Sequence, residues 1–376
     1  MIKRTLQNTL SAKIGTEKAI VVVGPRQVGK TTLIKQLLEG VPHLFLDGDD
    51  PVVRDVLDGA STETIRQLIG SHKLVFVDEA QRINQIGLTA KIITDQFKDV
   101  QVILSGSSAF EIKSLANEPL TGRKWEYNLL PIHWKELEDA VGYIKAQQQL
   151  NVRLVYGMYP EIINHLGEER ERLSLLADSY LYKDVLSLTG IRKPEVVERL
   201  LKALAYQVGS QVSYNELSRT LGIDKKTVMS YISLLKQSYI IYSLPSFSRN
   251  LRNELKTSQK IYFYDNGIRN AVIGNFDPIE ARDDKGALWE NFLLGERLKH
   301  NIYSQSGADL HFWRTTRQQE IDAIETRGSN ICGYEFKWNA EAKVRIPKTF
   351  TSEYNSKVQV IDPTNFRSFV NPSETD

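Results

Sequence analysis

The chain has 376 residues, of which 41% are hydrophobic and 25% charged, and its formal net charge is +2. This length predicts two or three domains, and no run approaches the ~20 apolar residues of a membrane span or forms the apolar core of a signal peptide. Cys332 is the only cysteine, which excludes disulfides within the chain and thiolate metal clusters, so we expect a cytoplasmic protein without a membrane partner.

A glycine loop follows the first apolar run of the sequence. Residues 19–23 predict a buried strand, the loop after them satisfies the phosphate-loop pattern, and a helical stretch follows. Lys30 would contact the β- and γ-phosphates of ATP or GTP, and Thr31 would hold Mg²⁺ through its hydroxyl. The predicted nucleotide-binding residues are Gly24, Pro25, Arg26, Gln27, Val28, Gly29, Lys30, Thr31 and Thr32.

Acidic and small polar residues follow two later strands. Residues 74–77 predict a buried strand that ends in Asp78 and Glu79. Asp78 would support Mg²⁺, and Glu79 would orient or deprotonate the attacking water. The next strand, residues 100–104, leads into Ser105–Ser108, where Ser107 either contacts the γ-phosphate or water, or belongs to an ordinary turn.

Strands alternate with helical stretches up to about residue 145, which predicts a doubly wound α/β domain over residues 1–145. Arg123 follows the strand that leads into Ser107. Arginine suits the stabilisation of transition-state charge on phosphates, so Arg123 is a candidate arginine finger, acting on the nucleotide of a neighbouring subunit. The alternative is a solvated loop arginine.

Two further domains follow, a helical one over residues 146–208 and a winged helix-turn-helix over residues 209–265. The second is predicted by the order helix, glycine turn, helix, strand, loop, strand. Residues 202–260 contain nine lysines and arginines against three acids. Such a surface suits DNA phosphates, although a winged helix used only for protein contacts is the alternative. The candidate DNA contacts are Lys225, Lys226, Arg249 and Arg252.

The last segment, residues 266–376, contains a second group of charged residues. Glu290 lies on a predicted helix, Asp322 on a predicted strand, and Glu335 and Lys337 two apart on the next strand. This arrangement is similar to PD-(D/E)XK nucleases. The similarity implies that Asp322 and Glu335 bind a metal ion and that Lys337 helps to activate water. Paired charges on an exposed strand are the alternative.

With these residues in place, the chain resembles prokaryotic AAA-type ATPases that carry the C-terminal domain of unknown function 4143. The matching stretches span nearly the whole sequence and are Gly24–Thr32, Leu74–Arg82, Ser105–Ser108, Leu120–Arg123, Met158–Glu161, Tyr262–Gly267 and Gln319–Lys337. The resemblance implies an ATPase core, a helical lid, a winged helix and a PD-(D/E)XK-like terminal domain. It does not supply a substrate.

Three functional hypotheses follow. The first is an ATP-driven machine that remodels DNA. The second is a non-cleaving binder of branched DNA such as Holliday junctions. The third is a signalling switch of the STAND type that acts on protein partners. A homo-oligomer is expected if Arg123 acts between subunits, and a hexamer is favoured by analogy.

Overall fold

The chain forms two compact units in a computed structural model. The first unit contains Lys3–Pro131 and Gln237–Tyr239, and the second contains nearly all the rest. None of the described helices is both long and apolar enough to cross a membrane. The structure describes residues 2–107, 120–178, 193–247, 259–315 and 317–372.

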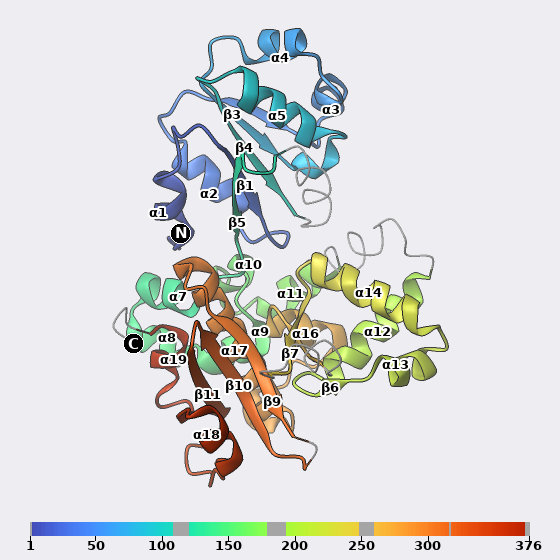
Figure 1. The fold of residues 1–376 in the computed structure, drawn as a ribbon, viewed down its shortest axis with the longest axis vertical. Coiled ribbons are helices and arrows are strands. Elements are labelled where there is room, and N and C mark those ends of the chain that lie inside the picture. The colour runs from blue at the N-terminus through green and yellow to red at the C-terminus, as the bar shows by residue number, and fades with distance from the viewer. Residues whose placement is uncertain (1, 108–119, 179–192, 248–258, 316, 373–376) are drawn as a thin grey trace. The chain divides into compact units, whose positions relative to one another are not determined.

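A five-stranded parallel sheet forms the core of the first unit (Figure 1). The strands are β1 (Ala19–Val23), β2 (Leu44–Asp47), β3 (Leu74–Asp78), β4 (Gln101–Gly106) and β5 (Lys124–Asn128). They lie in the order β2-β3-β4-β1-β5, with parallel neighbours throughout. Every residue of β1, β3 and β4 is buried, as expected for central strands of a covered sheet. This confirms the predicted α/β class.

The sequence analysis did not single out β5, although its alternation of polar and aromatic residues is typical of a half-buried strand, in which only Tyr127 is buried. It pairs with β1 as an edge strand, and the Leu129 N–H after it donates to the Val23 carbonyl at 2.8 Å. The helices of this unit are α1 (Leu6–Ser11), α2 (Lys30–Leu37), α3 (Pro51–Leu57), α4 (Thr62–Ile69), η1 (Ala80–Arg82) and α5 (Ile86–Gln96).

The main segment of the second unit begins at Ile132, within the range 1–145 predicted from the sequence for the first domain, and its first elements are helices. They are α7 (Trp134–Val141), α8 (Tyr143–Gln148), α9 (Leu150–Tyr156), α10 (Pro160–Ile163), α11 (Glu169–Ala177) and α12 (Pro194–Tyr206). The helix α12 buries the stripe Val196, Val197, Leu200, Leu201 and Leu204. This spacing of three and four residues is that of an amphipathic helix on a core.

Two helices and a small antiparallel sheet come next. They are β6 (Gln211–Val212), α13 (Tyr214–Leu221), α14 (Lys225–Gln237), β7 (Ile241–Pro245) and β8 (Gln259–Phe263), with the strands in the order β6-β8-β7. Ser213 caps α13 by accepting the Glu216 N–H at 3.3 Å, and Gly222 ends that helix at φ 69°.

A four-stranded sheet closes the chain, in the order β12-β11-β10-β9. The pair β11–β12 is parallel and the other pairs are antiparallel. Its core contains Trp313, Ile321, Ile324, Phe350 and Tyr354. The elements are α16 (Asn266–Ile273), η3 (Ile279–Ala281), α17 (Lys285–Ser304), β9 (Asp309–Arg314), β10 (Glu320–Arg327), β11 (Asn330–Phe336), α18 (Lys348–Tyr354), β12 (Val358–Ile361) and α19 (Phe366–Val370).

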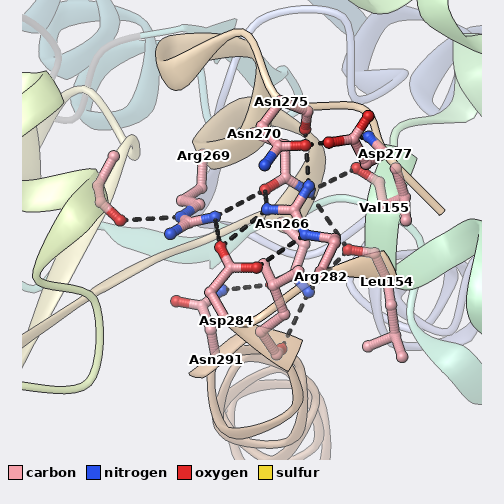
Figure 2. Close-up of polar contacts among 12 residues, drawn as sticks. Leu154, Val155, Asn266, Arg269, Asn270, Asn275, Asp277, Arg282, Asp284 and Asn291 are labelled. Atoms are coloured by element: carbon pink, nitrogen blue, oxygen red, sulfur yellow. Dashed lines mark hydrogen bonds and ion pairs between the residues drawn. The ribbon is translucent and has the colours of Figure 1, made fainter. Parts of the chain in front are cut away.

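Figure 2 shows the polar contacts that join α16 to segments distant in sequence. Asn270 Nδ2 donates to the Val155 carbonyl of α9 at 2.7 Å, and Asn266 Nδ2 donates to the Leu288 carbonyl of α17 at 3.0 Å. Arg269 Nε donates to the Ala205 carbonyl of α12 at 2.8 Å. These buried bonds satisfy polar groups that would otherwise cost folding energy, so they fasten the predicted helical lid to the terminal domain.

Asp284 holds two buried arginines of this network (Figure 2). Arg269 Nη1 lies 2.5 Å from Asp284 Oδ2, and Arg282 Nε lies 2.8 Å from Asp284 Oδ1. Burial alone would raise the pKa of Asp284, but its bonds to Arg282 and Arg269 outweigh burial and lower the pKa. The carboxylate is therefore charged over the whole neutral range.

Candidate functional site

The phosphate loop between β1 and α2 has the backbone that its sequence predicts. Gly29 lies in the left-handed region at φ 91°, and a Cβ on Gly24 would come within 2.0 Å of the Leu129 carbonyl oxygen. Both positions therefore require glycine. Buried Arg4 supports the loop, because its Nη1 donates to the Val28 carbonyl at 2.7 Å. No sequence pattern indicates Arg4, which lies far upstream of the motif.

Lys30 is buried at the start of α2. Its ammonium donates to the carbonyl oxygens of Gly24 at 3.0 Å and Pro25 at 2.7 Å. Burial lowers the pKa of Lys30 to about 8, although Glu79 and Asp78 oppose this shift. The ammonium therefore lies inside the loop whose backbone N–H groups would bind phosphates.

Asp78, Thr31 and Ser105 meet at the carboxyl edge of the sheet. Thr31 Oγ1 donates to Asp78 Oδ2 at 2.7 Å, and Ser105 Oγ donates to Asp78 Oδ1. Hydroxyl and carboxylate oxygens are the ligands that Mg²⁺ prefers, and it usually takes one or two from protein together with phosphate oxygens and water. The residues present thus fit a nucleotide-bound Mg²⁺.

Glu79 has an uncommon backbone conformation, left-handed at φ 46°. A Cβ on Gly48, after β2, would lie 2.5 Å from the Glu79 carbonyl oxygen, so a glycine is required beside it. Gln81 Nε2 donates to Glu79 Oε2 at 2.5 Å and to Ser107 Oγ at 3.1 Å. Gln81 thereby connects Glu79 and Ser107, two of the three predicted catalytic residues. Ser108 lies outside the described residues.

Sequence reasoning missed Gln81, because a glutamine two positions after an acid carries no signal of its own. The residue matters only through the fold, which brings the ends of β3 and β4 together at one sheet edge. Of the other loop residues, Pro25 and Val28 are buried, and Gln27 and Thr32 are exposed.

Arg123 lies immediately before β5 and pairs within its own chain. Its Nε donates to Asp95 Oδ1 of α5 at 2.6 Å, with side chains 42% and 35% exposed. Exposed pairs of this kind contribute only about 0–1 kcal/mol. The pairing is therefore weak enough for Arg123 to leave Asp95 for another partner.

The second charged group lies on the C-terminal sheet. The register Ala323↔Tyr334 puts Asp322 beside the end of β11, where the Phe336 N–H donates to Asp322 Oδ2 at 2.8 Å. Lys337 Nζ lies 2.9 Å from Glu335 Oε2 and 3.7 Å from Asp322 Oδ2. The structure thus brings Asp322, Glu335 and Lys337 together, as predicted from their spacing.

Glu290 of α17 joins this group through residues that the sequence did not single out. Tyr262 OH donates to Glu290 Oε1 at 2.5 Å, and Lys260 Nζ lies 3.2 Å from the same oxygen. Lys260 also lies 2.7 Å from Glu320 Oε1. Burial raises the pKa of Glu290 to about 7, with Lys260 opposing and Asp322 adding to the shift.

This group does not fit a divalent cation as it stands, because lysine ammonium groups already contact its carboxylates. Across the part of the chain that the structure describes, no three His, Cys, Asp or Glu side chains are grouped to hold a metal ion. We therefore derive no metal-dependent step from Asp322 and Glu335.

The predicted winged-helix region presents two exposed lysines, Lys225 and Lys226, in the first turn of α14. Arg249 and Arg252 lie outside the described residues. Lys260, one of the nine bases counted in this region, is only 2% exposed and paired with two glutamates. It therefore does not belong to a phosphate-binding surface, which corrects that count.

Three family profiles match separate parts of the sequence. An AAA domain matches residues 16–138, a domain of unknown function (DUF8612) matches residues 147–278, and a second domain of unknown function (DUF4143) matches residues 285–373. The first includes every residue of the candidate nucleotide site except Arg4.

Two relatives match most of the chain at low sequence identity. An uncharacterised protein of Mycobacterium tuberculosis is 27% identical over 326 residues, 85% of this chain and 70% of that protein. One of Haemophilus influenzae is 23% identical over 340 residues, 83% of this chain and 80% of that protein.

Solved structures that resemble parts of the chain include the following two. The Walker-type ATPase PABY2304 of Pyrococcus abyssi has a TM-score of 0.49 and 14% identity, over 73% of this chain and 96% of that one. The Thermotoga maritima RuvB Holliday junction branch migration motor has a TM-score of 0.35 and 18% identity, over 68% of this chain and 95% of that one. At these values neither structure informs the function of this chain.

Proposed function

We propose that this AAA-type P-loop ATPase, which carries a domain of unknown function 4143, hydrolyses ATP to remodel DNA bound by its second unit. The ATPase assignment follows from the AAA match and from the site in which Lys30, Asp78 and Glu79 meet. Glu79, held by Gln81, would orient the attacking water, and Mg²⁺ held at Thr31 and Asp78 would neutralise developing phosphate charge.

The exposed pair Lys225–Lys226 is the observation that carries the DNA proposal. It lies at the N-terminus of α14, the second helix of a helix-turn-helix, where the helix dipole adds to the positive charge of the lysines. The three-stranded sheet that follows supports a winged helix. The order α17-β9-β10-β11-α18-β12 supports a PD-(D/E)XK-like terminal domain, for which we propose binding of structured or branched DNA, such as Holliday junctions, rather than cleavage.

Replacing Lys225 and Lys226 with alanine is expected to weaken binding to all DNA sequences. Because each lost phosphate contact lowers the slope of log affinity against log salt by about 0.9, the slope should fall by about 2. Gel shifts with duplex, single-stranded, forked and four-way DNA over a salt series measure both effects.

The matched control replaces Lys145 and Lys348, two exposed lysines on other helices of the same unit. It removes the same charge and should leave the salt slope unchanged. If both double variants lower the DNA affinity and the salt slope equally, DNA binding does not depend specifically on Lys225 and Lys226. Absence of any DNA binding by the wild-type chain at low salt would refute the proposal.

A STAND-like switch that acts through protein partners is the second candidate. Met229 is 47% exposed on α14, one turn after Lys225. A flexible apolar side chain on that surface suits a protein contact. DNA indifference at low salt would favour this function.

Arg123 is proposed to act in trans in a homo-oligomer, with a hexamer favoured. Arg123→Ala should then lower ATP turnover by about 10³-fold or more, as loss of an arginine finger does. Mixing it with Glu79→Gln protein should restore partial activity at interfaces that combine an intact Arg123 with an intact Glu79.

Asp95→Ala is the matched control for that experiment, because it breaks the same ion pair and leaves the guanidinium in place. It should keep nearly normal turnover. If Asp95→Ala and Arg123→Ala behave alike, or if mixing restores nothing, Arg123 is only a structural partner of Asp95.

A further inference from the structure

We propose that Lys260 is the resident cation of the carboxylate group on the C-terminal sheet, so that this group keeps its structure without a divalent metal ion. The inference rests on the proposed function in that it concerns the terminal domain proposed to bind structured DNA. Its evidence does not depend on DNA binding.

Lys260 reaches the group from a different sheet. It lies on β8, between β6 and β7, and its ammonium contacts Glu290 of α17 at 3.2 Å and Glu320 of β10 at 2.7 Å. Its side chain is 3% exposed, and the ammonium lies 5.5 Å from the ring centre of fully buried Phe312. A lysine buried in this way has no aqueous position to which its ammonium could swing.

The charges of the group are nearly balanced by its own residues. Four carboxylates, those of Glu290, Glu320, Asp322 and Glu335, are contacted by Lys260 and Lys337. Arg314 Nη1 adds a third cation, 3.5 Å from Glu320 Oε2. If all four carboxylates are ionised, the three cations leave one excess negative charge, and the pKa of Glu290, which burial raises to about 7, brings the group closer still to neutrality.

A divalent cation and Lys260 compete for the same oxygens. Mg²⁺ and Mn²⁺ require oxygen ligands at about 2.0–2.2 Å in a near-octahedral shell. The Glu290 Oε1 atom already accepts from Lys260 and from Tyr262 OH, and Glu335 Oε2 accepts from Lys337. Metal entry would compete with these bonds and bring a divalent charge close to two ammonium groups in a poorly hydrated site, which is costly.

Lys260 also connects two parts of the second unit. It lies on β8 of the three-stranded sheet and contacts Glu290 of α17 and Glu320 of β10. Phe247 N–H strengthens this junction by donating to the Phe312 carbonyl at 2.6 Å. The cation that holds the carboxylates thus also fixes how the helix-turn-helix and the terminal domain are joined within the second unit.

The test is a Mn²⁺ titration of the nucleotide-free full chain, with bound Mn²⁺ counted by electron paramagnetic resonance and stability followed as Tm. The wild-type chain and the Asp322→Asn variant should bind the same number of Mn²⁺ ions per chain. The Tm of the wild-type chain should not change when Mn²⁺ is added. Lys260→Met should fold with a lowered Tm, gain about one Mn²⁺ per chain, and recover part of its Tm as Mn²⁺ is added.

The double variant Lys260→Met with Glu290→Gln is the matched control. It keeps the size of both side chains but removes the uncompensated carboxylate, so it should be more stable than Lys260→Met and gain less Mn²⁺. Wild-type Mn²⁺ binding that is lost in Asp322→Asn would overturn the proposal even if Lys260→Met fails to fold. A folded Lys260→Met chain that gains no Mn²⁺ would overturn it as well.

DNA binding in EDTA separates this inference from the proposed function. If the wild-type chain binds no DNA but also no Mn²⁺ at this group, the DNA proposal fails and the role of Lys260 stands. If the wild-type chain binds DNA in EDTA and also binds Mn²⁺ through Asp322, the DNA proposal stands and the role of Lys260 fails.

Discussion

Replacing Glu79 with glutamine is expected to lower the kcat for ATP hydrolysis by about 10²–10⁴-fold, the range that a positioned general base contributes. Glutamine keeps the size of the side chain, and its amide oxygen can still accept the hydrogen bond that Gln81 Nε2 donates to Glu79. The phosphate loop and the Thr31–Asp78 pair are untouched, so ATP should still bind. Single-turnover hydrolysis and a nucleotide-binding titration on the same protein measure the two effects separately.

Lys30→Ala is the control, because it removes the only ammonium that lies inside the described phosphate loop. It should weaken nucleotide binding and turnover together. A Glu79→Gln enzyme that hydrolyses ATP at the wild-type rate would show that another group acts on the water, and Gln81 with Ser107 would then be the first residues to replace.

Replacing Asp284 with alanine is expected to lower the free energy of unfolding of the second unit by about 3 kcal/mol or more, since removal of one partner leaves buried charges uncompensated. Arg269 and Arg282 are 2% and 3% exposed, and both contact this carboxylate. For a unit of this size the loss corresponds to roughly 6–12 °C in Tm. Differential scanning calorimetry measures it.

Asp139→Ala is the matched control within the same unit. Asp139 pairs with Lys135 at 2.8 Å, but its side chain is 63% exposed, so the loss should stay below about 1 kcal/mol. Comparable losses in the two variants would mean that the arginines find other partners.

The pH dependence of the Asp284 effect has a definite sign. The pKa of Asp284 is lowered in the folded state by Arg282 and Arg269, which outweigh the opposing effect of burial. Its contribution is therefore complete above the unfolded pKa of about 3.9 and is lost as the pH falls through the folded pKa. The difference between wild type and Asp284→Ala should shrink only in that acidic range.

The features that were predicted best are those determined by residues adjacent along the sequence. The strands β1 and β3 are apolar runs, and the phosphate loop is a contiguous motif that lies between a strand and a helix. Their burial and backbone angles follow from local chemistry. Residue spacing on paired strands likewise predicted that Asp322 and Glu335 would lie together.

The residues that the sequence did not indicate act through contacts distant along the chain. Gln81 reaches Ser107, 26 residues away, and Lys260 reaches Glu290, 30 residues away on another element. In the sequence, Lys260 is one of the nine basic residues over positions 202–260. Only its burial against two glutamates distinguishes it from a lysine that could face phosphate.

The contacts of α16 also determine when the second unit can form during synthesis. The carbonyl oxygens of Leu154 and Val155 bond to side chains that follow 112 and 115 residues later. At about 5–20 residues per second, the ribosome needs roughly 6–23 s to supply them. Helix α9 therefore emerges long before its partners on α16, and the unit is expected to fold in one late step once α17 has been made, leaving an interrupted nascent chain open to proteases.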